Sequence, residues 1–94
     1  MYILTSDRKN IVDSGFVERF CVVNKPDAIL IIASYSTDRA VTIGKYANTK
    51  EAFDAFHGLF ASIKSGSDYE MPDSVLFHGE NRKQDARTKR KGGS

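Results

Sequence analysis

The fold of this chain is decided by the stretch AILIIASY at positions 28–35. Residues 28–33 are all apolar, so a β-strand formed there has apolar side chains on both faces. In a small sheet such a strand lies at the centre. Either both of its faces are covered within the chain, or a partner covers one of them.

The chain around this stretch contains further segments of strand length that are rich in β-branched and aromatic residues. We expect strands at 2–5, 11–12, 16–23 and 40–46. Pro26 ends the strand that precedes the central one, because proline cannot donate to a sheet ladder. A bulge at Gly44 would place Tyr46 on the same face as Ile43. The prediction is one small antiparallel sheet of four to five strands.

One amphipathic helix is predicted over 49–65. Asn48 and Glu51 resemble a capping box, with Thr49 as a rival N-cap, and Gly66 is placed to end the helix. Between them runs an apolar stripe at helical spacing. Its large members are Phe53, Phe56, Leu59, Phe60 and Ile63. We expect this stripe to pack on one face of the sheet, which makes the fold class α+β.

Residues 1–77 are predicted to form the single domain, with an extended segment at 68–72 that Pro72 keeps from pairing inside a sheet. Residues 78–94 contain no apolar side chain larger than Ala86 and are expected to be a flexible, disordered tail. The first part holds eight Lys/Arg and ten Asp/Glu, for a net charge of −2. The tail holds six Lys/Arg and two acidic residues, so the basic character of the chain resides there.

The basic residues of the tail are Arg82, Lys83, Arg87, Lys89, Arg90 and Lys91. Flexible cations of this kind neutralise phosphates and bind nucleic acid in a salt-sensitive, sequence-independent way. No aromatic residue lies beyond Phe77, so stacking on bases is not predicted. A solubilising tail, or an arm for an acidic protein surface, fits the same pattern.

Candidates for catalysis are few. Cys21 could pair with His57 or His78 as thiol and imidazole, but a buried, inert cysteine is the favoured interpretation. The histidines do not have metal-ligand spacing with Cys21 or with an acidic pair, and no glycine-rich phosphate loop is present. We therefore expect no enzyme, no metal and no cofactor.

The composition favours a cytoplasmic protein. The one cysteine cannot form an internal disulfide, and the apolar opening at 1–4 is too short for a signal-peptide core. No apolar run approaches the length that spans a bilayer.

Tyrosines at strand positions suit interfaces, because they combine an apolar body with a polar tip. Together with the two-faced strand at 28–33 they predict a homo-oligomer, most simply a homodimer. The candidate interface residues are Tyr2, Ile29, Ile31, Tyr35 and Tyr46.

The opening YILTSDRKNIV at 2–12, the segment TIGKY at 42–46 before the capped helix, and YEMP at 69–72 are similar to short hypothetical proteins of Gram-positive bacteria and their phages. The resemblance covers about residues 1–73. It implies a small β-rich sheet with one helix, often encoded on mobile elements. It implies no established activity and no functional residues.

The function expected first is a small non-catalytic interaction protein that binds and modulates or inhibits a host or cellular protein. An antidefence-type inhibitor is the version suggested by analogy with phage proteins. The first alternative is a nucleic-acid-binding accessory protein that uses the basic tail. The second is an oligomeric protein that binds a small ligand or nucleotide between subunits.

Overall fold

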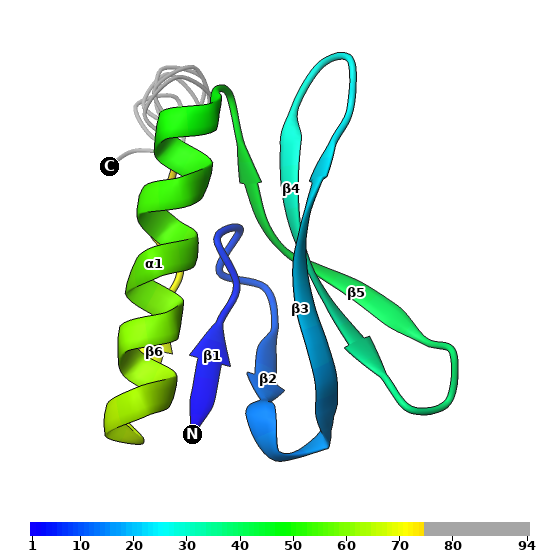
Figure 1. The fold of residues 1–94 in the computed structure, drawn as a ribbon, viewed down its shortest axis with the longest axis vertical. Helices are drawn as coiled ribbons and strands as arrows, with labels where there is room; N and C mark the ends of the chain where they lie inside the picture. Colours follow the sequence, from blue (N-terminus) through cyan, green and yellow to red (C-terminus); the bar gives the residue numbers. More distant parts are fainter. Residues whose placement is uncertain (75–94) are drawn as a thin grey trace, which may run out of the picture.

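The computed structural model describes residues 1–74 of the 94-residue chain, and these form two small sheets and one helix (Figure 1). In chain order the elements are β1 (Tyr2–Leu4), β2 (Ile11–Asp13), a 3-10 turn (Ser14–Phe16), β3 (Val17–Asn24), β4 (Ile29–Tyr35), β5 (Ala40–Tyr46), α1 (Thr49–Ser65) and β6 (Tyr69–Glu70). The α+β class is confirmed. Within these residues no helix is long and apolar enough to cross a membrane. The predicted tail and the last residues of the predicted domain, 75–77, lie outside the described residues.

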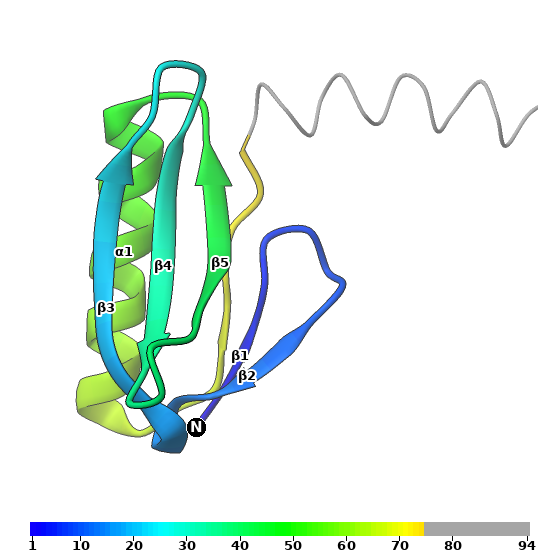
Figure 2. The same cartoon turned by 90° about the vertical axis from the view of Figure 1, so that its right-hand side faces the viewer.

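The larger sheet has the strand order β3-β4-β5 and is antiparallel throughout. Figure 2 shows its three strands side by side, with α1 behind them. The apolar stretch forms the central strand β4, as predicted. Ile31 pairs with Gly44 and Ile32 with Thr42, so Ile43 is the additional residue of a bulge. This bulge places both Ile43 and Tyr46 in the core.

The smaller sheet has the order β2-β1-β6 and corrects the prediction of one antiparallel sheet. β1 and β2 are antiparallel, but β1 and β6 are parallel, with Ile3 opposite Tyr69. The loop between β1 and β2 is bonded to the larger sheet at Ser6, whose N–H donates to the Ile43 carbonyl (2.8 Å) and whose hydroxyl accepts from the Lys45 N–H (3.2 Å). Pro72 does not prevent β6 from pairing, because the last ladder bond, from the Met71 N–H to the Leu4 carbonyl (2.9 Å), precedes it.

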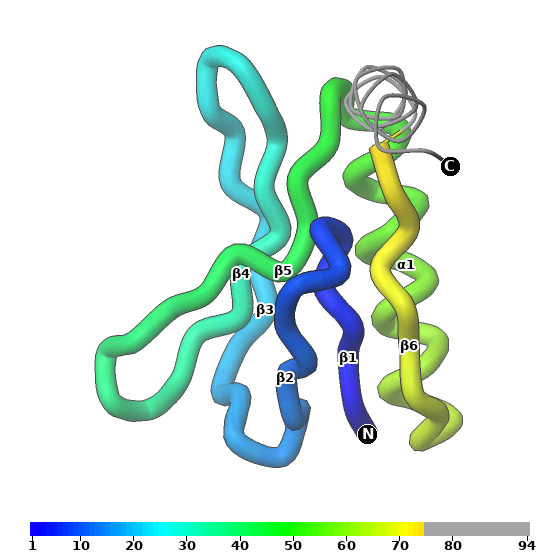
Figure 3. Tube along the Cα trace, turned by 180° about the vertical axis from the view of Figure 1, so that it is seen from behind, coloured from blue at the N-terminus to red at the C-terminus, as the bar shows by residue number. Residues whose placement is uncertain are grey.

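The core lies between α1, the inner face of β4 and β5, and the smaller sheet. Figure 3, seen from behind, shows β1 and β6 running beside α1. The buried side chains of the core cluster are Ile3, Val12, Ile31, Ala33, Ile43, Tyr46, Ala52, Ala55, Leu59 and Met71. They come from both sheets and from the helix, so the two sheets share one core.

Both predicted ends of α1 are confirmed. The Asn48 side chain accepts a hydrogen bond from the Glu51 N–H (2.9 Å), and the Glu51 carboxylate accepts one from the Ala47 N–H (3.2 Å). Thr49 is the first helical residue rather than the cap. Gly66 ends the helix with a φ of 74°, a left-handed conformation that glycine adopts without strain.

The face of α1 that enters the core differs from the predicted stripe. The buried residues of the helix are Ala52, Ala55 and Leu59. Phe53, Phe60 and Ile63 are exposed, and Phe56 is only partly buried. Small alanines let the helix backbone approach the sheet closely, so the larger apolar residues are left on its side.

Candidate protein interface

Most of the apolar stripe of α1 lies to one side of the face that the helix buries. Because an α-helix advances about 100° per residue, Phe60 and Phe53 lie roughly 100–120° round the axis from the buried Leu59. Their exposed fractions are 59% and 42%, and that of Ile63 is also 42%. The surplus of apolar residues therefore forms a second, lateral face on the helix.

This lateral face borders β3. A groove of about 210 Å³ separates α1 from the strand and is lined by Phe20, Phe56, Leu59, Phe60 and Ile63. Every lining residue is apolar, and Phe20 also packs against the core. We call Phe20 together with Phe53, Phe56, Phe60 and Ile63 the apolar flank.

The few polar groups beside the apolar flank are cationic or aromatic. The Lys64 ammonium lies 5.3 Å from the centre of the Phe60 ring, within range of a cation–π interaction. The His57 ring is tilted by 43° against Phe53, at 6.1 Å between ring centres. Both groups lie on α1 itself, so they border the flank without crossing the groove to β3.

β3 is an edge strand. It pairs with β4 on one side, and among residues 1–74 no strand pairs with its other side. Proteins protect such edges with bulges, lysines or prolines. Here the register shifts between Val17 and Arg19, which leaves Glu18 as a bulge at one end. The remainder, residues 19–24, is regular and mainly apolar, so its free backbone groups form a template for another strand.

The outer face of the larger sheet is also apolar at its centre. Ile31 and Ala33 of β4 face the core, so Leu30 and Ile32 between them face away from α1. Val23 and Cys21 are their partners on β3. All four side chains are of intermediate exposure. We call the surface that they form the open face of the larger sheet.

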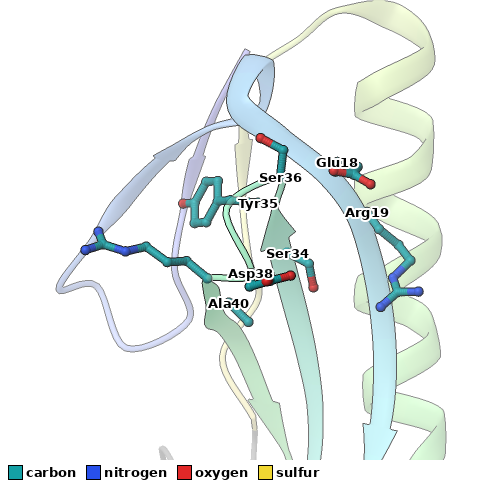
Figure 4. Close-up of a pocket in the computed structure, with 8 residues that line it drawn as sticks. Glu18, Arg19, Ser34, Tyr35, Ser36, Asp38 and Ala40 are labelled. Carbon is teal, nitrogen blue, oxygen red and sulfur yellow. The ribbon is translucent and has the colours of Figure 1, made fainter.

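A polar hollow of about 490 Å³ lies at the far end of the same sheet, around the β4–β5 turn. Figure 4 shows Glu18 and Arg19 reaching it from β3, with Tyr35 and Asp38 on the side of the turn. Acidic and basic side chains are mixed along its wall, so the hollow favours neither an anionic nor a cationic ligand.

The structure separates the predicted interface residues. Ile31 and Tyr46 are 0% and 1% exposed, so their side chains belong to the core of the chain. Ile29 and Tyr35 pack against that core and are partly buried. Tyr2 is exposed and lies on the smaller sheet, whereas β3 belongs to the larger one. The outward residues of the central strand are Leu30 and Ile32, which the sequence argument did not select.

The groups considered for catalysis are not brought together. Cys21 lies on β3 on the open face, whereas His57 is exposed on α1, which covers the opposite face. Within the described residues no group of His, Cys, Asp and Glu is arranged to hold a metal ion. His78 and the six basic residues proposed for nucleic-acid binding lie outside the part that the structure describes.

Comparison with known proteins identified no relative of this chain. No protein-family model matches the chain, and no curated protein or solved structure matches it either.

Proposed function

We propose that this chain is a small non-catalytic interaction domain of the cytoplasm that binds protein through the apolar flank. The observation that carries the proposal is the exposure of Phe53, Phe60 and Ile63 on a helix whose buried face is built from alanines and Leu59. Contiguous exposed apolar side chains on a small domain are typical of interaction sites.

The neighbourhood of the apolar flank favours a polypeptide over other ligands. The groove is smaller than the roughly 300–1,000 Å³ of typical small-molecule pockets. Beside it runs the free edge of β3, whose backbone N–H and C=O groups need hydrogen-bonding partners. A lipid surface would leave those groups unsatisfied, whereas another strand satisfies them while its side chains enter the groove.

The resemblance to phage and mobile-element proteins supports a host or cellular protein as the target. Inhibition of a host system is our proposal for the outcome of that binding. It rests on analogy, whereas the surface itself rests on the geometry of α1 and β3.

Site-specific photocrosslinking in cells that produce the full chain tests the proposal. A benzophenone amino acid placed at position 60 should form adducts with a defined protein that mass spectrometry identifies. The matched control is position 16, because Phe16 is 73% exposed but lies in the 3-10 turn, outside the apolar flank. Absence of any adduct at positions 53 and 60 would refute the proposal.

The second candidate function is nucleic-acid binding, favoured by the six Lys/Arg and two acidic residues of 78–94. Fluorescence anisotropy of labelled DNA and RNA, titrated with the full chain, measures it. The tail is a nucleic-acid arm if binding weakens steeply with salt and disappears when the six basic residues are replaced by glutamine. Binding that survives this replacement excludes the tail as the site. No observation favours the ligand-binding alternative.

A further inference from the structure

We infer that the occupant of the apolar flank is a second copy of this chain, with β3 of one copy pairing antiparallel to β3 of the other. The inference rests on the proposed function: it takes the protein bound by the apolar flank to be a second copy, and it assigns the host or cellular target to the open face of the larger sheet. Its basis is the free edge of β3, the groove beside it and the charges along the strand.

The backbone of β3 is oriented for this pairing. In the β3–β4 turn the Lys25 N–H donates to the Ala28 carbonyl (2.9 Å), and the register continues from Asn24 opposite Ile29. In an antiparallel ladder the backbone groups of alternate residues point to opposite sides. Those of Phe20, Val22 and Asn24 therefore point away from β4, towards an incoming strand.

Symmetry brings the two grooves together. Antiparallel pairing of identical strands places a two-fold axis perpendicular to the sheet, which keeps the same face of the sheet on the same side in both copies. Each α1 then lies on one side of the joined sheet, flanking the seam. The apolar flanks face each other, and all the residues that line the two grooves are apolar. The Lys64 ammonium of each copy lies at the border of this contact, over its own Phe60 ring.

The charges and the bulge favour one register among those centred between Arg19 and Val22. Centring the pair on Arg19 would oppose two arginines, and centring it on Val22 would oppose Arg19 to Lys25; both are unfavourable. Centring it on Phe20 would place the bulged Glu18 opposite Val22, within the ladder. Centring it on Cys21 opposes Phe20 to Val22 and Arg19 to Val23, without a like-charged pair.

The exposed apolar side chains of α1 supply part of the area that a dimer needs. The exposed parts of Phe53, Phe60 and Ile63 amount to roughly 250 Å² per copy, if a large side chain presents about 180 Å². A standard interface buries about 800 Å² per partner. The edge of β3, with Phe20 and the partly buried Phe56, supplies further area along the whole strand. Additional burial also suits a domain this small, whose own core is limited.

Pairing would have a consequence for the open face. Cys21, Val23, Leu30 and Ile32 of both copies would become the centre of one continuous sheet. The dimer would thus leave an apolar, two-fold-symmetric surface free for a different protein.

The mass of the full chain in solution tests the inference. Sedimentation equilibrium over a range of concentrations should give twice the 10.5 kDa chain mass. Phe60→Asp should shift the chain to monomer, whereas Phe16→Asp should leave it dimeric. Val22→Pro should also give monomer, because it removes an outward N–H while the bonds to β4 remain. Circular dichroism checks that each variant is folded.

Cysteine crosslinking tests the register. Across the proposed axis the two Cys21 residues form a non-hydrogen-bonded pair, the kind in which opposing Cβ atoms come closest, about 4.5 Å, which is the upper limit for a disulfide. Mild oxidation should therefore produce a covalent dimer. Val23→Cys in a Cys21→Ser background should not crosslink, because each new cysteine opposes Arg19.

A chain that stays monomeric at all concentrations overturns the inference, as does a dimer that both Phe60→Asp and Val22→Pro leave intact. Crosslinking of the Val23→Cys variant but not of Cys21 overturns the register centred on Cys21 and shows a pairing centred on position 23 instead. If the chain is monomeric but a photocrosslinker at position 60 captures a different, identified protein, the proposed function stands and this inference fails. If there is neither dimer nor adduct, both fail.

Discussion

The hydroxyl of Tyr46 on β5 donates a hydrogen bond of 2.8 Å to the backbone carbonyl of Pro72, which follows β6. The Tyr46 side chain is almost wholly buried, and its ring covers Gly44, where a Cβ would come within 2.6 Å of the ring. This bond connects the larger sheet to the segment that runs on from the smaller one. It therefore fastens the last described residues to the core.

Replacing Tyr46 with Phe should lower the free energy of unfolding by about 1–2 kcal/mol. The ring remains to fill the core, but the Pro72 carbonyl loses its partner in a partly buried position. Chemical denaturation monitored by circular dichroism measures the change. Tyr2→Phe is the control, because Tyr2 is 57% exposed, and it should be neutral. Equal effects of the two substitutions would show that the bond to Pro72 adds nothing to stability.

The same side chain predicts a loss of stability at alkaline pH. Burial raises the pKa of Tyr46 above its ordinary value near 10, and burial also raises that of Tyr69. Above pH 10 the unfolded chain therefore releases a proton that the folded chain keeps, so the free energy of unfolding falls as pH rises. One such group contributes at most about 1.4 kcal/mol per pH unit. In denaturation experiments between pH 9 and 11.5, the free energy of unfolding should fall less steeply with pH for Tyr46→Phe than for the unaltered chain. The slope that remains in this variant is attributed to Tyr69. Parallel slopes would contradict the prediction.

Local signals in the sequence were sufficient for the elements with local causes. The cap at Asn48, the left-handed end at Gly66 and the central position of β4 each depend on neighbouring residues. The parallel pairing of Ile3 with Tyr69 does not, because the two strands are short and far apart in the chain. The shared core brings them together, with the Asp68 carboxylate accepting from the Tyr2 N–H (2.8 Å) and the Met71 carbonyl accepting from the Arg8 side chain (2.8 Å). No periodicity in the sequence records these long-range contacts.

The candidate interface could be predicted only in outline. Apolar periodicity identified the stripe on α1 but gave equal weight to Leu59, which is buried, and Phe60, which is exposed. The face that α1 turns towards the sheet is determined by Ala52 and Ala55, whose small side chains permit the helix to approach the sheet closely. On β4 the assignment of faces differs by one position, and a shift of one residue moves every side chain to the other face.

Asn48→Ala should destabilise the protein by about 1 kcal/mol, because the Glu51 N–H loses the side chain that it donates to. Thr49→Ala should cost much less, since Thr49 is already inside the helix and alanine is the better helix former. Thermal unfolding of the two variants side by side distinguishes the two possible caps. A larger loss for Thr49→Ala would mean that the helix starts one residue later.

The Tyr69 side chain leaves no room for a side chain at Gly58. A Cβ at this helical position would collide with the Tyr69 hydroxyl group and come within 2.9 Å of Cζ, and that hydroxyl donates to the Ala55 carbonyl (3.3 Å). Gly58→Ala alone should destabilise by roughly 1–3 kcal/mol, despite the gain in helix propensity. In a Tyr69→Phe background the same substitution should cost clearly less, because the colliding oxygen is gone. Additive effects in this double-mutant cycle would contradict the contact.

Leu59 and Phe60 are neighbours with opposite roles, and their substitution separates core from interface. Leu59→Ala should lower the free energy of unfolding by about 2–5 kcal/mol, since it empties a fully buried position. The loss of unfolding free energy for Phe56→Ala should be smaller than the roughly 3–5 kcal/mol expected for a fully buried phenylalanine, because Phe56 is only partly buried. Phe60→Ala should cost the least when measured at low protein concentration, where self-association contributes little.

Raising the protein concentration should affect the stability of the variants differently. If the apolar flank is buried in a dimer, the stability of the unaltered chain rises with concentration by mass action, and Phe60→Ala loses that increment. Leu59→Ala should retain most of it, because Leu59 lies at the floor of the groove and, at 1% exposed, offers almost no surface to a second copy. Denaturation curves at two concentrations for each variant measure the increment. A large, concentration-independent loss for Phe60→Ala would place Phe60 in the core instead and remove the basis of the interface.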